Sequence, residues 1–323
     1  MLNAMRTTFF LAALTGLFMV IGFVVGGQPG MVLALGFSIA TNAVAYWNAD
    51  KMILRLQNAE PLGRSRAPQL FNIVETLSAR AKIPTPRLFI IHTAQPNAFA
   101  TGRNPANSTV VVSSGLLENL EAHEVGAVIA HELAHIRSRD TLIMTISATF
   151  AGAISMLAQF GLFFGSRSSS NPVGPIGSIL MIVLAPVVAL LVQMAISRTR
   201  EYEADRDGAE ISGDPLALAT ALEKISKLAR NFENPWARRN SGMAHLFIIN
   251  PLAGPGGDNL FSTHPDVKNR IAALRQMASE VRTLVRADGA PNRRARIKKT
   301  GSGWRVPTIR QSGGNDDPSG PWG

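Results

Sequence analysis

Residues 7–49 carry no charged side chain, and this long uncharged run limits the possible folds more than any other feature of the sequence. The segment Gly26-Gly27-Gln28-Pro29-Gly30 divides the run into two apolar halves, residues 7–25 and 31–49. As a helix, at about 1.5 Å of rise per residue, each half would be roughly 28 Å long, close to the hydrocarbon thickness of a bilayer. The sequence therefore predicts two membrane-spanning helices. A cleaved signal peptide is the alternative for the first half, although the apolar core of such peptides is usually only about 7–15 residues long.

A second apolar region occupies residues 141–197, where a single arginine lies within a polar Gly/Ser/Pro-rich turn. We expect two further spans, at about residues 142–164 and 176–196. Because Ser and Gln side chains make these spans less apolar than the first pair, two buried core helices are the alternative.

The distribution of basic residues predicts the orientation of the spans. Lys and Arg flank each pair of spans on its outer ends, and the loops within the pairs contain a single arginine. By the positive-inside rule, both termini and both long polar segments lie in the cytoplasm. Two transmembrane hairpins are expected at residues 1–49 and 141–197, and one split cytoplasmic domain at residues 50–140 and 198–285. A basic, disordered tail is expected at residues 286–323.

Composition excludes several classes of protein. Apolar residues make up 46% of the chain and charged residues only 17%, which disfavours an ordinary soluble enzyme. The absence of cysteine excludes disulfides, cysteine-ligated zinc and thiol catalysis. The net charge of +10 lies mainly in residues 286–310 and accompanies no nucleic-acid-binding motif, so nucleic acid is not an expected partner.

Periodicity predicts the elements of the split domain. Apolar residues at helical spacing indicate a helix over about residues 70–81, and short apolar or β-branched runs indicate strands at 88–92 and 109–113, with 97–102 as a candidate third strand. Further helices are expected from about residue 116 without interruption to the membrane, and around residues 215–230 and 265–285.

The segment His131-Glu132-Leu133-Ala134-His135 carries the strongest chemical signal. Two histidines at i and i+4 lie on one face of a helix, where both imidazoles can reach a single Zn²⁺ ion. Glu132 lies about 100° further round the helix, so it can take a proton from a water molecule that the ion polarises. A chance match on an amphipathic helix is the alternative, and a suitable third ligand decides against it because a catalytic zinc site holds three protein ligands.

Three acidic residues, Glu201, Glu203 and Asp205, are candidates for that third ligand. Glu201 and Asp205 share one helical face at i and i+4, whereas Glu203 points the other way and is expected to be solvated. Spacing alone leaves open which of the first two binds the ion. A charged, solvated helix face is the alternative for all three.

Four segments in the same order closely resemble the HtpX-type membrane zinc proteases, which are relatives of the CAAX prenyl proteases. They are residues 131–140 (His-Glu-Leu-Ala-His-Ile-Arg-Ser-Arg-Asp), 197–205 (Ser-Arg-Thr-Arg-Glu-Tyr-Glu-Ala-Asp), 97–102 (Asn-Ala-Phe-Ala-Thr-Gly) and 261–265 (Phe-Ser-Thr-His-Pro). The resemblance extends from the first span to about residue 285. It implies a mainly α membrane protein, in which four transmembrane helices accompany an α+β, zincin-like (gluzincin) cytoplasmic protease domain.

The resemblance also implies roles for individual residues. It makes His131, His135 and Glu201 the ligands of one Zn²⁺ per chain and Glu132 the catalytic base. It makes Asp205 the acid that ends a Glu-x-x-x-Asp motif, where it orients a ligand or pairs with an arginine.

Three weaker sites accompany these assignments. Asn97, Ala98, Phe99 and Ala100 resemble the family's edge strand, along which an extended substrate adds by backbone hydrogen bonds; an ordinary loop ending in a turn glycine is the alternative. His264 and Arg270 are candidates to stabilise the oxyanion or to brace Asp205, although a histidine before proline is equally typical of a helix start. His123 has no second histidine four residues later and is expected to have a packing role.

Topology and resemblance together predict the function. If the helices run on unbroken, His135 and Glu201 lie about 7–11 Å beyond the ends of the second pair of spans. We therefore expect a zinc endopeptidase of the bacterial inner membrane that acts in membrane protein quality control, with the lipid bilayer and polypeptide chains as partners. Its expected substrates are misfolded or damaged membrane proteins, with unfolded cytosolic chains as a second candidate class. The alternatives are a CAAX-type processing protease, an intramembrane protease and a catalytically inactive membrane scaffold.

Overall fold

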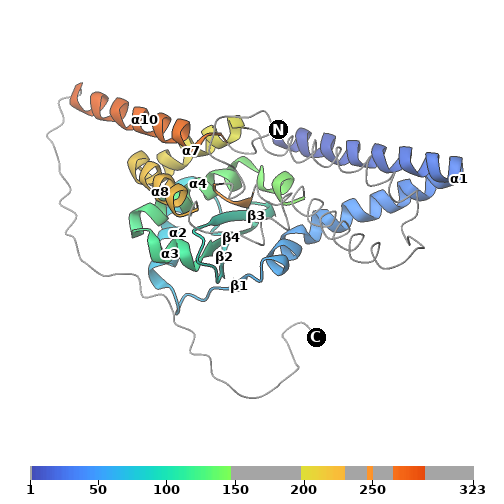
Figure 1. Cartoon of the computed structure of the whole chain (residues 1–323), viewed down its shortest axis with the longest axis horizontal. Helices are drawn as coiled ribbons and strands as arrows, with labels where there is room; N and C mark the ends of the chain where they lie inside the picture. Colours follow the sequence, from blue (N-terminus) through green and yellow to red (C-terminus); the bar gives the residue numbers. More distant parts are fainter. Residues whose placement is uncertain (1, 147–197, 230–245, 250–264, 288–323) are drawn as a thin grey trace, which may run out of the picture.

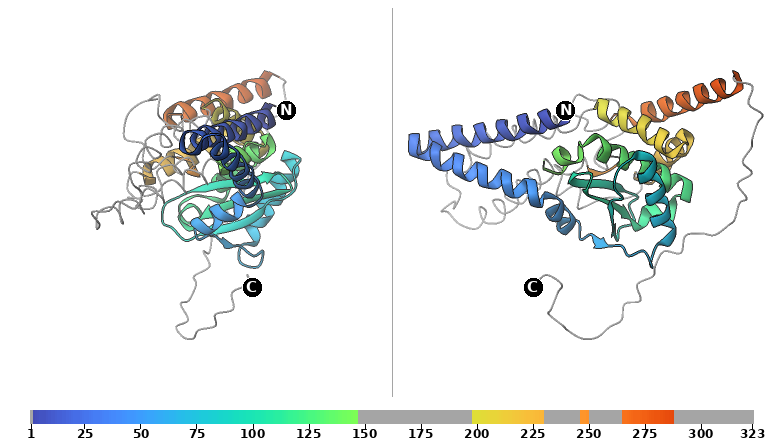
Figure 2. Two further views of the ribbon diagram at one scale, coloured as in Figure 1. Left: turned by 90° about the vertical axis from the view of Figure 1, so that its right-hand side faces the viewer. Right: turned by 180° about the vertical axis from the view of Figure 1, so that it is seen from behind.

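The structure is a computed structural model that describes residues 2–146, 198–229, 246–249 and 265–287. Within these residues a long helical hairpin projects from a body in which helices surround a small sheet (Figure 1). The same arrangement is visible from behind, where the hairpin extends away from the sheet (Figure 2).

Helix α1 (Leu2–Leu56) forms both arms of the hairpin. Only Gly26 and Gly27 have non-helical backbone angles, and Gly27 has a φ of 61°, a conformation that favours glycine. The expected hairpin is therefore confirmed, but its turn is shorter than predicted. Pro29 lies in the first turn of the second arm, where its missing N–H costs no hydrogen bond.

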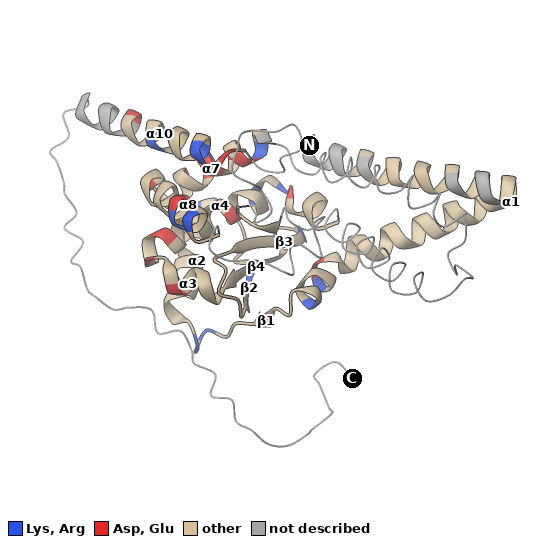
Figure 3. Cartoon of the chain, viewed as in Figure 1, with Lys and Arg blue, Asp and Glu red and all other residues tan. Residues whose placement is uncertain are grey.

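The two arms differ as candidate membrane spans. Among the described residues, Gly26–Leu56 is the one helix long and apolar enough to cross a bilayer, and Leu11–Val20 is an apolar but shorter segment. The second arm extends beyond the predicted end of the span at residue 49, and the charged residues of α1 gather near that end (Figure 3). Large apolar side chains such as Leu33, Phe37 and Trp47 are exposed along this arm, as expected for a lipid-facing helix.

Polar groups join the two arms inside the hairpin. Thr15 on the first arm accepts hydrogen bonds from Ser38 (3.1 Å) and Asn42 (3.0 Å) on the second. Because hydrogen bonds between apolar helices satisfy groups that lipid cannot, these bonds fix how the two arms meet.

The sheet contains four strands in the order β1-β2-β4-β3, with bounds Glu60–Pro61, Arg87–Ile91, Asn107–Ser113 and Ala98–Asn104 respectively. β2 and β4 are parallel, and β3 and β4 form an antiparallel hairpin. All three strand predictions are confirmed, including the candidate at 97–102. Its place in the strand order makes β3 an edge strand of the described sheet.

Besides a short helical segment at residues 141–146, the described body contains six helices: α2 (Pro68–Ala81), α3 (Ser114–Asn119), α4 (Ala122–Ser138), α7 (Arg198–Ser212), α8 (Pro215–Ala229) and α10 (Val267–Ala287). α4 lies at the centre, in contact with α2, α7, α8 and β3. Every residue from Glu124 to Ile136 in α4 is buried, so the helix that carries both candidate histidine ligands is also the core of the domain.

The expected unbroken helix from residue 116 to the membrane is wrong. Leu120 is extended, and α4 begins anew with a capping box in which Glu121 and Glu124 bond each other's backbone N–H groups. α4 then ends at Arg139, which adopts a left-handed φ of 57°, and helix resumes at Thr141. The second pair of predicted spans, apart from residues 142–146, lies outside the described residues.

Candidate metal centre

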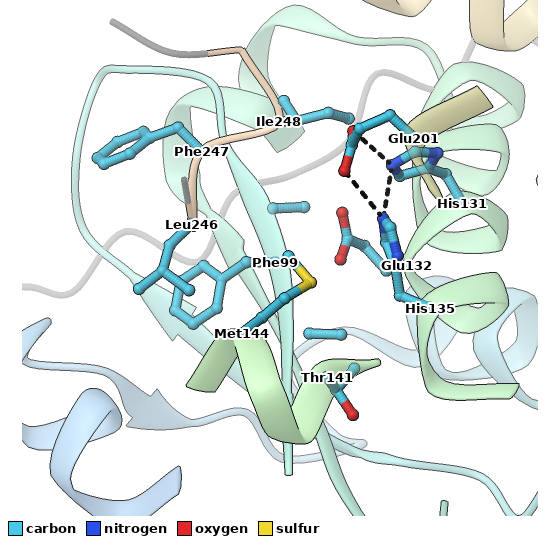
Figure 4. Close-up of a pocket in the computed structure, with 12 residues that line it drawn as sticks. Phe99, His131, Glu132, His135, Thr141, Met144, Glu201, Leu246, Phe247 and Ile248 are labelled. Carbon is cyan, nitrogen blue, oxygen red and sulfur yellow. Dashed lines mark hydrogen bonds and ion pairs between the residues drawn. The ribbon is translucent and has the colours of Figure 1, made fainter. Parts of the chain in front are cut away.

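Three side chains from two helices converge at the centre of the body. His131 and His135 lie one turn apart on α4 with their Nε2 atoms 3.2 Å apart. Glu201 on α7 reaches the same point: its Oε2 lies 3.9 Å from Nε2 of His131 and its Oε1 lies 3.6 Å from Nε2 of His135. One ligand atom from each residue lies within 4.8 Å of the others, the spacing of a metal-binding group (Figure 4).

The outer nitrogen of each imidazole faces a carboxylate. Nδ1 of His131 lies 3.1 Å from Oδ1 of Asp205, and Nδ1 of His135 lies 3.0 Å from Oδ2 of Asp140. In a neutral histidine whose Nδ1–H faces a carboxylate, Nε2 carries a lone pair. Two such lone pairs that face each other repel unless a cation lies between them, so this donor set fits a metal ion.

The charges around His135 support the same conclusion. Burial alone would lower its pKa, but the neighbouring carboxylates of Asp140, Glu201 and Glu132 outweigh burial and raise the pKa of His135 to about 10. A field that binds a proton this tightly also favours a divalent cation at the same point.

Asp205 lies behind the group of ligands rather than within it. The guanidinium of Arg270 donates two hydrogen bonds of 2.7 Å to its two oxygens. Burial opposes the ionisation of Asp205, but Arg270 and His131 more than compensate, and the pKa of Asp205 lies below its ordinary value. The structure therefore separates the two acids that spacing left open: Glu201 faces both Nε2 atoms, and Asp205 supports His131.

Arg270 itself is completely buried. Besides binding Asp205, its Nη1 lies 3.3 Å from Oε2 of Glu201 and donates to the carbonyl of Ile248 (3.2 Å). Of its two predicted roles, the structure shows the contact with Asp205. His264, its companion in the prediction, lies outside the described residues.

Glu132 points into the space beside the three ligands rather than toward them (Figure 4). Burial is the largest cause that raises the pKa of this carboxyl group, and Glu201 adds to the rise. A carboxylate with increased proton affinity, next to a metal-binding group, is suited to accept a proton from water.

The pocket in front of Glu132 has apolar walls. β3 contributes Ala98, Phe99 and Ala100, and Met144 and Leu246 approach from other parts of the chain (Figure 4). β3 is an edge strand of the described sheet, and the backbone of Ala100 in this wall bonds the carboxyl group of Glu132.

Asn97 directly precedes β3, and its side chain bonds other parts of the protein. Its side chain is buried, donates to the carbonyl of Leu246 (3.4 Å) and accepts from the N–H of Ile248 (3.1 Å). It therefore holds residues 246–249 against the pocket, and its amide is already occupied by the protein itself.

Two other predictions concern residues away from the ligands. Glu203 is exposed, as expected. His123 is also exposed and lies 3.5 Å from Glu121, far along α4 from the ligand pair.

Sequence reasoning missed two parts of the site. Asp140 has no predicted role beyond its place in the 131–140 motif, although its position five residues after His135 was a usable signal. The apolar segment 246–249 has no motif and no periodic pattern, so nothing in the sequence assigned it to the pocket.

A close helix crossing brings α7 to the ligands. A Cβ atom at Gly208 would lie 2.8 Å from both the N and the Cα of His131, so only glycine permits this approach. The crossing sets the distance from α7 to α4, and with it the distance from Glu201 to the histidines.

Comparison with known proteins identifies the family of the chain. A crystal structure of Ste24p from S. mikatae is 21% identical with a TM-score of 0.47; the match covers 84% of this chain and 65% of that one, so the present chain spans less than two thirds of the length of Ste24p. Residues 64–278 match the family described as "Peptidase family M48". This range includes β3, α4 and α7 with all three side chains of the candidate metal centre. Since this match covers more than half of the sequence, the chain belongs to peptidase family M48.

Proposed function

We propose that this protein is an HtpX-type, zinc-dependent endopeptidase of the bacterial inner membrane. The convergence of His131, His135 and Glu201, with Glu132 directly beside them, is the observation that carries the proposal. Zinc is the expected ion because two imidazoles and one carboxylate form a known catalytic zinc set that leaves one position open.

The protein's own residues have distinct tasks in the proposed reaction. When bound, the ion would polarise the scissile carbonyl and acidify a water molecule. Glu132 would take the proton of the attacking water and deliver it to the leaving amine. β3 would hold the substrate as an added strand, and the apolar wall of Phe99, Met144 and Leu246 would receive its side chains.

The proposed ligands can be tested with a matched pair of acidic residues on α7. Glu201→Ala is expected to weaken zinc binding by more than about 100-fold, beyond the usual loss for an outer partner of a ligand, and to abolish cleavage of casein. Glu203→Ala, which changes an exposed neighbour, is expected to leave both properties unchanged. Zinc content is measured by elemental analysis of the full chain in detergent, and cleavage with and without chelator. Zinc bound equally by both variants would contradict the proposal.

The proposed orientation places the metal centre in the cytoplasm and the turn of the α1 hairpin on the other side of the membrane. Because the chain contains no cysteine, single cysteines can report this topology without background. In intact spheroplasts, a membrane-impermeant maleimide is expected to label Gln28→Cys in the turn, and to label Glu118→Cys on α3 only after permeabilisation; both positions are exposed. Labelling of Glu118→Cys from outside would contradict the orientation.

The proximity of the pocket to α1 favours substrates that are themselves held in the membrane. Phe99 and Leu246 of the pocket wall pack in one apolar cluster with Ile53 and Leu54 at the end of α1. A loop or tail of a membrane protein that emerges beside this arm would reach β3 directly. We therefore propose damaged or misassembled membrane proteins as the main substrates, in a quality-control role.

A further inference from the structure

Asp140 lies where two helices meet. α4 ends before it, at the left-handed residue Arg139, and a new helical segment begins after it at Thr141. The backbone of Asp140 belongs to both: its N–H donates to the carbonyl of His135 (3.3 Å), and its carbonyl accepts from the N–H of Met144 (3.2 Å). Any movement of the second segment relative to α4 therefore moves Asp140.

The side chain of Asp140 does not act as a helix cap. An aspartate just before a helix ordinarily accepts a hydrogen bond from an N–H group of the first turn. Here Oδ2 lies 3.0 Å from Nδ1 of His135, and Oδ1 has no hydrogen-bond partner in the described part of the chain. The residue is only 2% exposed, so bulk solvent scarcely reaches the carboxylate. The carboxylate is thus directed at one imidazole.

The segment that begins at Thr141 is attached to both the sheet and the hairpin. Thr141 donates to the carbonyl of Gly102 (3.2 Å), and the hydroxyl of Thr145 lies 3.0 Å from that of Thr101, so the segment follows the candidate substrate strand β3. On its other side it enters a separate apolar cluster with both arms of α1, formed by Leu14, Ala49, Ile143 and Ile146.

Asp205, the corresponding partner of His131, is held in another way. Arg270 on α10 donates hydrogen bonds to both oxygens of Asp205 on α7, so two helices of the body hold this carboxylate. Among the described residues, no lysine or arginine pairs with the carboxylate of Asp140; its partner is His135, and its direction depends on its backbone. Of the two imidazoles, His135 is therefore the one whose orientation follows the packing of the α1 hairpin.

We propose that Asp140 is a positioning residue that couples the packing of the membrane hairpin to the metal ligand His135. The inference rests on the proposed zinc-peptidase function and adds a means by which the membrane-embedded part acts on the site. Asp140 keeps Nε2 of His135 directed at the ion, and a shift of the segment 141–146 against α1 reorients it. The result is a change in metal affinity and turnover without any change in the ligands themselves.

The first test compares substitutions in the full-length protein in detergent. Asp140→Ala is expected to weaken Zn²⁺ binding by about 10–100-fold and to change the visible spectrum of the Co²⁺-loaded protein, because an unsupported imidazole reorients. Asp140→Asn keeps an acceptor for Nδ1–H and is expected to recover part of the affinity. Asp207→Asn is the matched control, since Asp207 on α7 pairs with Arg137, a residue of α4 that is not one of the three grouped ligands.

The outcomes separate this proposal from the proposed function. A wild-type protein that binds no Zn²⁺ would overturn the proposed function itself. Normal Zn²⁺ affinity and an unchanged Co²⁺ spectrum in a folded Asp140→Ala protein would overturn only the role of Asp140, and would reduce it to a packing residue.

A double-mutant cycle tests the coupling to the hairpin. Ile146→Ala creates a cavity at the contact with α1 and is expected to weaken Zn²⁺ binding severalfold in the wild-type background but not in the Asp140→Ala background. Thr145→Val, which removes the hydroxyl that contacts Thr101 on β3 without creating a cavity, tests in the same way the attachment of the segment to the sheet. Equal losses in both backgrounds, or no loss in the wild type, would overturn the coupling.

Discussion

Replacing Glu132 with glutamine is expected to lower kcat/KM for peptide hydrolysis by about 10³–10⁴-fold while zinc stays bound, the upper part of the range for general acid–base catalysis. Glu132 is not one of the three grouped ligands, so the variant keeps every proposed metal contact. It loses the carboxylate whose pKa is raised mainly by burial, and an amide cannot accept the proton of the attacking water. Cleavage rates and zinc content of the same preparation are the two measurements.

A matched control and a capture experiment refine this prediction. Glu118→Gln changes an exposed carboxylate on α3 and is expected to cleave at the wild-type rate. Since Glu132→Gln should still bind substrate along β3, the proteins that it retains in the cell are expected to be mainly membrane proteins. If the variant cleaves as fast as the wild type, or loses zinc together with activity, Glu132 is not the base proposed here. Retention of cytosolic proteins alone would contradict the substrate class.

Replacing Arg270 with methionine is expected to lower the free energy of unfolding by about 3–5 kcal/mol. The guanidinium is 0% exposed and holds Asp205 by two hydrogen bonds, with Glu201 at 3.3 Å. Methionine fills much of the same volume but leaves buried negative charge without its cation. The carbonyl of Ile248 loses a donor as well. Denaturant unfolding of the zinc-loaded protein, followed by a probe within the helical body, measures the loss.

Two further variants show whether charge is the cause. Arg275→Met breaks an exposed pair with Glu223 and is expected to leave the free energy of unfolding nearly unchanged, because solvent screens exposed ion pairs. Adding Asp205→Asn to Arg270→Met removes the unpaired carboxylate and is expected to recover part of the stability. The effects of substitutions at residues in direct contact are not additive. A cost below about 1 kcal/mol for Arg270→Met, or no recovery in the double variant, would show that the pair contributes little to folding.

Local geometry explains which predictions the structure confirmed. The run of β-branched residues at 109–112 and the two glycines of the α1 turn act over a few residues, and the elements appear where these signals lie. The same holds for His131 and His135, because every α-helix places side chains at i and i+4 on one face, whatever surrounds the helix.

Local geometry also explains where prediction stopped or was wrong. Arginine rarely adopts the left-handed backbone conformation, so the residue type at position 139 does not predict the end of α4. Glu201 and Asp205 share one face of α7, and spacing treats them as equivalent. Their different roles depend on where α7 crosses α4, which the close approach at Gly208 sets.

The sequence by itself determined the kind of protein: a chain with a long uncharged hairpin, a histidine pair with an adjacent glutamate, and an acidic helix that offers candidates for a third ligand. These are properties of residue type and helical period, which operate within one or two turns. Only the tertiary structure decided that Glu201 faces the histidines, that Arg270 and Asp140 support the site from opposite sides, and that residues 246–249 close the pocket. Each of these contacts joins segments that are separate elements of the chain, and their meeting depends on the packing of a buried core around α4 rather than on any local pattern.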